Sequence, residues 1–157
     1  MTVSMIQPTI DANSVLAGAQ FIDAFSITVP DTALGARAAA ERMFGRSPRW
    51  VRLLMRLRDL IVAPFGLTKS TAARQAPVDR IGMFPVISAT PRRLIAGFND
   101  NHLDFRVVVD VAADDAGTRV TTTTVVLTHN LLGRTYLAVI TPFHRLVART
   151  MLRQVAG

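Results

Sequence analysis

The chain has 157 residues, the length of one domain with one hydrophobic core. Half of the residues are hydrophobic, which argues against disorder, and the absence of cysteine excludes disulfides and thiolate chemistry. The net charge is +7, and almost all of the positive charge is arginine, because Lys69 is the only lysine. This balance suits nucleic acid, an acidic membrane or an anionic ligand, and it also fits a host whose coding favours arginine.

No basic segment followed by an apolar run opens the chain, and no stretch of about 18 apolar residues lacks both arginine and proline. We therefore expect neither a secretory signal nor a membrane span, and the cytoplasm is the expected compartment. Residues 1–19 have no clear periodicity, which predicts a flexible N-terminal arm. A single domain is expected over residues 20–157.

One strand and two helices are predicted in the first half. Phe21–Val29 alternates apolar and polar residues in part and reads as a strand. A helix over Thr32–Phe44 is expected to start at an Asp31 cap and to end at Gly45. Ser47 and Pro48 predict the start of a second helix, which Gly66 closes. Its apolar residues recur at spacings of three and four and predict one buried stripe: Trp50, Leu53, Leu54, Leu57, Ile61 and Phe65.

Four strands in a meander follow a loop over 67–79. They are expected over Ile81–Ala89, Arg92–Asn99, His102–Ala113 and Thr118–His129. A two-residue turn at Asp100-Asn101 would pair Phe98 with Leu103, Ala96 with Phe105, and Leu94 with Val107. The same register, carried over the next turn, places Thr122 and Thr124 on the apolar face. The other face is predicted to be polar.

A long helix is expected to cover that apolar face, with Asn130 as its cap and with a bend at Pro142. Its apolar residues fall on one side at helical spacing: Leu132, Tyr136, Val139, Ile140, Phe143, Val147 and Met151. We predict that Tyr136, Phe143 and Val147 are buried against the sheet. Arg145, Arg149 and Arg153 fall on the opposite side and are expected to be solvated.

The predicted fold class is α+β, with about five strands in a curved antiparallel sheet packed on a long C-terminal helix, and with two helices after the first strand. The motifs that carry a family resemblance are Phe21-Ile22-Asp23-Ala24-Phe25, Pro48-Arg49-Trp50-Val51-Arg52, Pro64-Phe65-Gly66-Leu67, His102-Leu103-Asp104-Phe105-Arg106, and His129-Asn130 through Gly133-Arg134 and Tyr136 to Pro142-Phe143-His144-Arg145. By these motifs the chain resembles the bacterial domain of unknown function 2867 over about Leu16 to Arg153. Its pattern also resembles the START and polyketide-cyclase superfamily, which implies a helix-grip fold. The resemblance implies no assigned chemistry.

The strongest site prediction is a cavity between the sheet and the last helix. Phe98, Phe105, Thr122, Thr124 and Tyr136 would surround it, because large aromatic residues share the apolar face with threonine hydroxyls. From the last helix, Phe143 and His144 are further candidates for ligand contact. A core or boundary position for His144 is the alternative interpretation.

A second group of polar residues lies on the opposite face. His102, Asp104 and Arg106 alternate along one strand, and His129 is predicted to lie opposite His102. A histidine pair with Asp104 would suit acid–base work or a metal, whereas ordinary exposed polar residues are the alternative. No third ligand is evident, so we predict no metal, and no motif predicts a cofactor.

The sequence leaves three alternative functions open. The first is a small-molecule binding domain with an apolar or amphipathic ligand. The second is an enzyme of the cyclase or hydratase type that uses His102, Asp104 or His144 as proton carriers. The third is electrostatic binding of nucleic acid or acidic membrane through two groups of arginines: Arg49, Arg52, Arg56, Arg145, Arg149 and Arg153.

Overall fold

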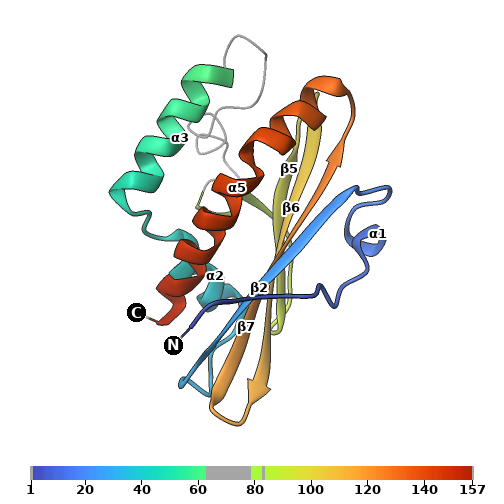
Figure 1. Cartoon of the computed structure of the whole chain (residues 1–157). Helices are drawn as coiled ribbons and strands as arrows, with labels where there is room; N and C mark the ends of the chain where they lie inside the picture. Colours follow the sequence, from blue (N-terminus) through green and yellow to red (C-terminus); the bar gives the residue numbers. More distant parts are fainter. Residues whose placement is uncertain (1, 63–78, 83, 157) are drawn as a thin grey trace.

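The structure, a computed structural model, describes residues 2–62, 79–82 and 84–156 (Figure 1). The elements in chain order are β1 (Ser4–Ile6), α1 (Ala12–Val15), β2 (Phe21–Val29), α2 (Ala36–Phe44), α3 (Arg49–Val62), β3 (Arg80–Ile81), β4 (Phe84–Ala89), β5 (Arg93–Asn99), β6 (Leu103–Asp114), β7 (Gly117–Thr128), α5 (Leu131–Arg153) and the short 3₁₀ turn η2 (Gln154–Ala156). In the described residues the strands form one antiparallel sheet in the order β1-β2-β7-β6-β5-β4-β3. The predicted α+β class is confirmed, but this sheet has seven strands rather than about five.

Helices α2, α3 and α5 lie on one face of the sheet, and α1 lies on the other (Figure 1). The core fills the space between the sheet and α2 and the end of α5. Fully buried members include Phe25 of β2, Met43 of α2 and Leu152 of α5. The covered face is therefore the inner face of a two-layer domain.

The strand pairing differs from the predicted register by two residues between β5 and β6. Phe98 pairs with Phe105, and Ala96 pairs with Val107. The turn is longer than predicted, because the Asp100 N–H donates to the Leu103 carbonyl at 2.9 Å. A shift of two residues keeps every side chain on its predicted face, since the side-chain period of a strand is two.

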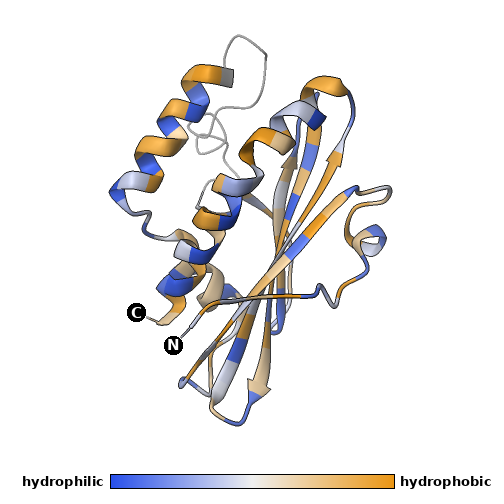
Figure 2. Ribbon diagram, viewed as in Figure 1, coloured by the Kyte–Doolittle hydropathy of each residue, from blue (hydrophilic) through white to orange (hydrophobic). Residues whose placement is uncertain are grey.

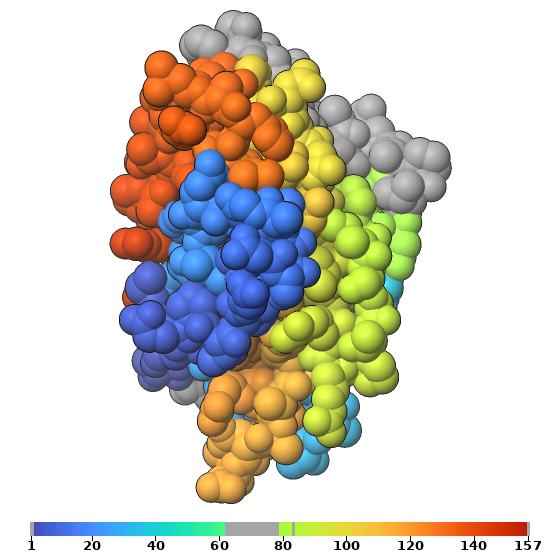
Figure 3. Space-filling model, turned by 90° about the vertical axis from the view of Figure 1, so that its right-hand side faces the viewer, coloured from blue at the N-terminus to red at the C-terminus, as the bar shows by residue number. Residues whose placement is uncertain are grey.

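The outer face of the sheet is only partly polar. Ala24, Val108 and Val125 lie on it and are fully buried. The N-terminal residues cover part of this face, where the blue segment lies over the strands in Figure 3. Residues 1–19, expected to form a flexible arm, thus include β1, which pairs with β2, and helix α1.

Helix α2 begins at Ala36 rather than Thr32. The Asp31 carboxylate accepts a hydrogen bond from the Ala33 N–H at 2.9 Å, so it closes a local turn before the helix. Gly35 is the residue that precedes the first helical position, and Gly45 ends the helix as predicted.

Helix α3 exposes most of its predicted apolar stripe. It begins at Arg49, one residue after the predicted Pro48, and Phe65 and Gly66 lie outside the described residues. The exposed fraction is 63% at Leu53, 53% at Leu57 and 58% at Ile61. Val51, on another side of the helix, is buried instead. Figure 2 shows hydrophobic and hydrophilic residues alternating along this helix.

Helix α5 is one helix, as predicted, but the side that it turns to the sheet differs in part from the predicted one. The Asn130 side chain accepts from the Gly133 N–H at 2.9 Å, which confirms the predicted cap, and the helix continues through Pro142. The predicted burial of Phe143 is wrong, because this side chain is 51% exposed. His144 faces the sheet instead, together with Val147 and Met151 of the predicted apolar side.

The arginines of α5 differ in their surroundings. Arg145 and Arg153 are exposed, as predicted. The prediction is wrong for Arg149, whose guanidinium carbon lies 5.1 Å from the centroid of the Phe25 ring. This stacking places a cation on the aromatic face of a fully buried side chain. No helix in the described part of the chain combines the length and the apolar character needed to span a membrane.

Replacing Gly133 by alanine is expected to destabilise the fold by about 1–3 kcal/mol. Helix propensity alone favours alanine over glycine by about 1 kcal/mol. A Cβ at Gly133, however, would collide with the backbone carbonyl of His102, where α5 starts against the sheet. Urea unfolding measures the difference. Ala138→Gly, at an exposed position of the same helix, is the control and should cost about 1 kcal/mol; a stabilised Gly133→Ala would show that the helix start does not touch the strand.

Candidate functional site: an apolar cavity under helices α3 and α5

A cavity of about 120 Å³ lies between the inner face of the sheet and helices α2, α3 and α5. Most of its lining is apolar: Met43, Phe44, Val51, Met55, Phe84, Phe105, Val107, Val147, Ala148 and Met151. The polar side chains in the lining are Ser47, Thr122, Thr124 and His144. Apolar walls with a few polar groups are the usual chemistry of a small-molecule site.

The structure brings together four of the seven predicted site residues. Phe105, Thr122, Thr124 and His144 all line the cavity. The two threonines are buried on the inner face of β7, so their predicted orientation toward the helices is confirmed. Threonine on this face brings hydroxyl groups to an otherwise apolar wall.

Phe98 contacts the wall without lining the cavity. Its ring centroid lies 6.1 Å from that of Phe84 and 5.7 Å from that of Phe105. Phe84 and Phe105 are themselves stacked at 5.2 Å, and Phe44 meets Phe84 edge-on at 5.6 Å. These four aromatic rings form one end of the inner face.

Tyr136 joins α5 to α3 rather than lining the cavity. The Arg58 Nε donates a hydrogen bond to the Tyr136 hydroxyl at 2.8 Å, and the guanidinium lies 5.4 Å from the Tyr136 ring centroid. Burial lowers the pKa of Arg58, but its interactions with Tyr136 and Asp59 outweigh burial and raise the pKa above its ordinary value. The contact holds α3 beside α5, and α3 supplies Val51 and Met55 to the cavity.

A buried acid–base pair lies at the sheet side of His144. Asp23 of β2 has a side chain that is 3% exposed, and its Oδ1 lies 3.3 Å from the Nε2 of His144, whose side chain is 18% exposed. The other carboxylate oxygen, Oδ2, is buried and has no hydrogen-bond partner among the described residues. This contact orients the imidazole and leaves Nδ1 as the ring nitrogen not engaged by Asp23.

Asp23 was not among the predicted site residues. The signal was available, because the alternation of β2 places Asp23 on the same face as Phe21 and Phe25. An acidic residue at an inward position of a strand needs a partner on the covering element. The His144 and Phe21 rings also meet in a T-shaped arrangement, with centroids 6.1 Å apart.

The polar group on the outer face does not reach the cavity. His129 Nε2 lies 2.9 Å from Asp104 Oδ1, and the His102 ring nitrogen lies 2.9 Å from the Asn130 amide. Arg106 donates to the backbone carbonyls of Phe98 and Phe105. Within the described ranges, no three side chains of histidine, cysteine, aspartate or glutamate come together as metal ligands would.

Comparison with known proteins bears on the family only. No curated protein and no solved structure matches the chain. A family model described as a protein of unknown function (DUF2867) matches residues 15–151. That match covers most of the chain, and the protein therefore belongs to the DUF2867 family.

Proposed function

We propose that this domain binds an apolar or amphipathic small molecule in the cavity between its sheet and its helices. The observation that carries the proposal is the cavity of about 120 Å³, with mainly apolar walls and with Thr122, Thr124 and His144 as polar groups. An apolar cavity of roughly 150 Å³ holds a benzene molecule. The cavity thus suits one ring or a short alkyl chain.

The proposal includes a helix-grip arrangement, in which a curved sheet wraps a long helix. Two features support it: the single helix Leu131–Arg153 runs along the inner face, and the antiparallel sheet beside it is twisted (Figure 1). A ligand held between sheet and helix would then contact both layers.

A cavity-filling variant tests the binding proposal. Benzene, the probe, should raise the thermal midpoint of unfolding of the parent chain, because a ligand that binds only the folded state stabilises it. Ala148→Leu places a larger side chain in the lining and should abolish this shift. Ala138→Leu, on the exposed side of the same helix, is the matched control and should keep it. The proposal fails if benzene shifts neither the parent nor the control, or if it shifts all three proteins equally.

A second function is favoured by the Asp23–His144 pair. A histidine in the cavity lining, oriented by a buried carboxyl group 3.3 Å away, is suited to proton transfer to or from a bound molecule. The reaction class would be of the cyclase or hydratase type, with His144 as the proton carrier rather than His102 and Asp104. Native mass spectrometry would identify a co-purified molecule. If the domain is an enzyme, the parent chain should convert that molecule, and His144→Asn should bind it without converting it; conversion by the variant at the parent rate would exclude the role.

A further inference from the structure

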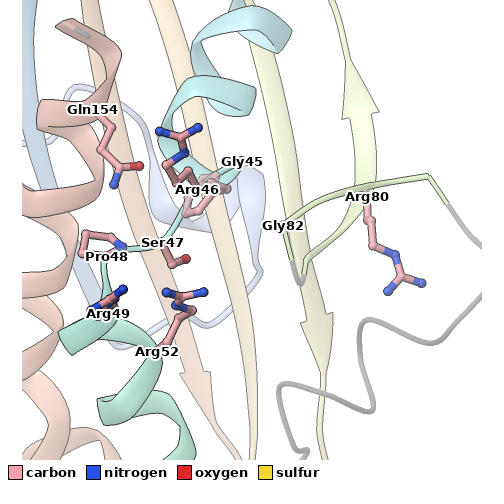
Figure 4. A pocket seen from close by; sticks show the side chains of 10 residues that line it. Gly45, Arg46, Ser47, Pro48, Arg49, Arg52, Arg80, Gly82 and Gln154 are labelled. Carbon is pink, nitrogen blue, oxygen red and sulfur yellow. The ribbon is translucent and has the colours of Figure 1, made fainter.

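A second hollow, of about 910 Å³, opens beside the apolar cavity. It lies between the α2–α3 connection, the first turn of α3 and strand β3 (Figure 4). Its polar lining consists of Arg46, Ser47, Arg49, Arg52, Arg80 and Gln154. No acidic residue belongs to the part of the lining that the structure describes, so the described charges of this arginine cleft are all positive.

Three of these arginines have no acidic partner among the residues that the structure describes. Arg46, Arg49 and Arg52 are exposed, and within the described ranges none of them forms an ion pair. The acidic residues near β3 and α2 are engaged elsewhere: Arg37 lies 2.6 Å from Asp79 and 3.3 Å from Glu41. Positive charges that line one hollow raise the local concentration of anions.

The start of α3 adds to the same electrostatic field. The helix begins at Arg49, and the residues before it, Ser47 and Pro48, also line the cleft. The first N–H groups of a helix have no partner within the helix and favour an anion. Figure 4 shows Arg46, Arg49 and Arg52 near the α2–α3 connection, with Arg80 beyond Gly82 and its side chain directed away from them in this view.

The arginine cleft and the apolar cavity are adjacent. Phe44, Ser47 and Gly82 line both of them. A molecule in the cavity that extends past these residues would reach the cleft. Its two ends would meet opposite chemistry: apolar walls at one end and guanidinium groups at the other.

We propose that the ligand is an anionic amphipath, with a short apolar tail in the cavity and an oxyanion head group in the arginine cleft. The inference rests on the proposed function, because the cavity must hold the tail. Guanidinium groups bind phosphate and carboxylate oxygens through paired, charge-assisted hydrogen bonds. The head group is therefore a phosphate or a carboxylate.

Calorimetric titration of the full chain with three probes tests the inference. Hexyl phosphate carries both parts, hexan-1-ol carries only the tail, and inorganic phosphate carries only the head group. Hexyl phosphate should bind at least roughly tenfold more tightly than either of the other two, and its affinity should fall as salt is added. Sodium hexanoate in place of hexyl phosphate distinguishes a carboxylate head group from a phosphate.

Two variants test the binding of the head group and the binding of the tail separately. Arg49→Gln/Arg52→Gln should weaken hexyl phosphate by at least roughly tenfold and leave hexan-1-ol unchanged. Ala148→Leu should weaken hexyl phosphate and hexan-1-ol and leave inorganic phosphate unchanged. Arg145→Gln/Arg153→Gln removes the same charge from exposed positions of α5 and should change none of the three. Thermal unfolding of each variant confirms that it is folded.

The outcomes separate the inference from the proposed function. If hexan-1-ol binds in the cavity, but hexyl phosphate binds no more tightly and ignores the arginine variant, the inference is overturned and the proposed function stands. If only the phosphate group matters, so that inorganic phosphate equals hexyl phosphate and Ala148→Leu has no effect, both are overturned. Binding of none of the probes also overturns both.

Discussion

Replacing Phe25 by alanine should destabilise the fold by about 3–5 kcal/mol. The Phe25 side chain is fully buried on the inner face of β2, within the main core. Its removal would leave a void that close-packed neighbours fill only in part. It would also take away the ring on which the Arg149 guanidinium stacks.

Phe143→Ala is the matched control for Phe25→Ala in denaturant unfolding. The same side chain is deleted, but Phe143 is 51% exposed, so the expected loss is about 1 kcal/mol or less. The sequence alone predicted that Phe143 is buried against the sheet. Equal losses at the two positions would mean that α5 turns a different side toward the sheet.

The second large effect is expected at the buried acid–base pair. His144→Leu should destabilise the fold by about 3–5 kcal/mol, because the buried Asp23 carboxylate would lose its partner. The second oxygen of this carboxylate already has no partner among the described residues.

A double variant separates the pair from simple packing. Replacing a buried ionic pair by two apolar residues of similar size is often neutral or stabilising. Asp23→Val/His144→Leu should therefore recover most of the stability that His144→Leu loses. Additive effects in this double-mutant cycle would argue that Asp23 and His144 do not interact.

The strands were predictable because their faces are fixed by alternation. Phe21–Val29 has the predicted bounds. The β5–β6 register was displaced by two residues, since the sequence Asp100-Asn101 suggested a tighter turn than the chain makes. The faces of Thr122 and Thr124 were nevertheless right, because an even displacement does not turn a strand over.

The helices were less predictable because each contacts more than one neighbour. The apolar side of α5 is wide, and the sheet takes only the part that includes His144 and Met151. Tyr136, on the same apolar side, faces α3 through Arg58. Spacing along one helix cannot say which of two neighbours each residue meets, so Phe143 was misplaced.

The candidate site was also predictable only in part. The threonines and Phe105 were found by strand alternation. Asp23 was missed because its partner, His144, lies 121 residues further along the chain. Arg49 and Arg52 were candidates for electrostatic binding of nucleic acid or membrane, but the cleft that they line was not predicted. Its shape depends on how the α2–α3 connection approaches β3, which local sequence does not encode.

The order of the sheet has a consequence for how the chain folds. Strand β2 has β7 as its neighbour, and Phe21 pairs with Val126. Strands β4 to β7 are neighbours in sequence and pair through short turns, so we expect them to assemble first. During synthesis β2 leaves the ribosome long before β7. Its edge toward β7 therefore stays unpaired until β7 has been made. We therefore expect slow completion of the sheet and a dependence on chaperones that a domain with only local strand pairing would not have.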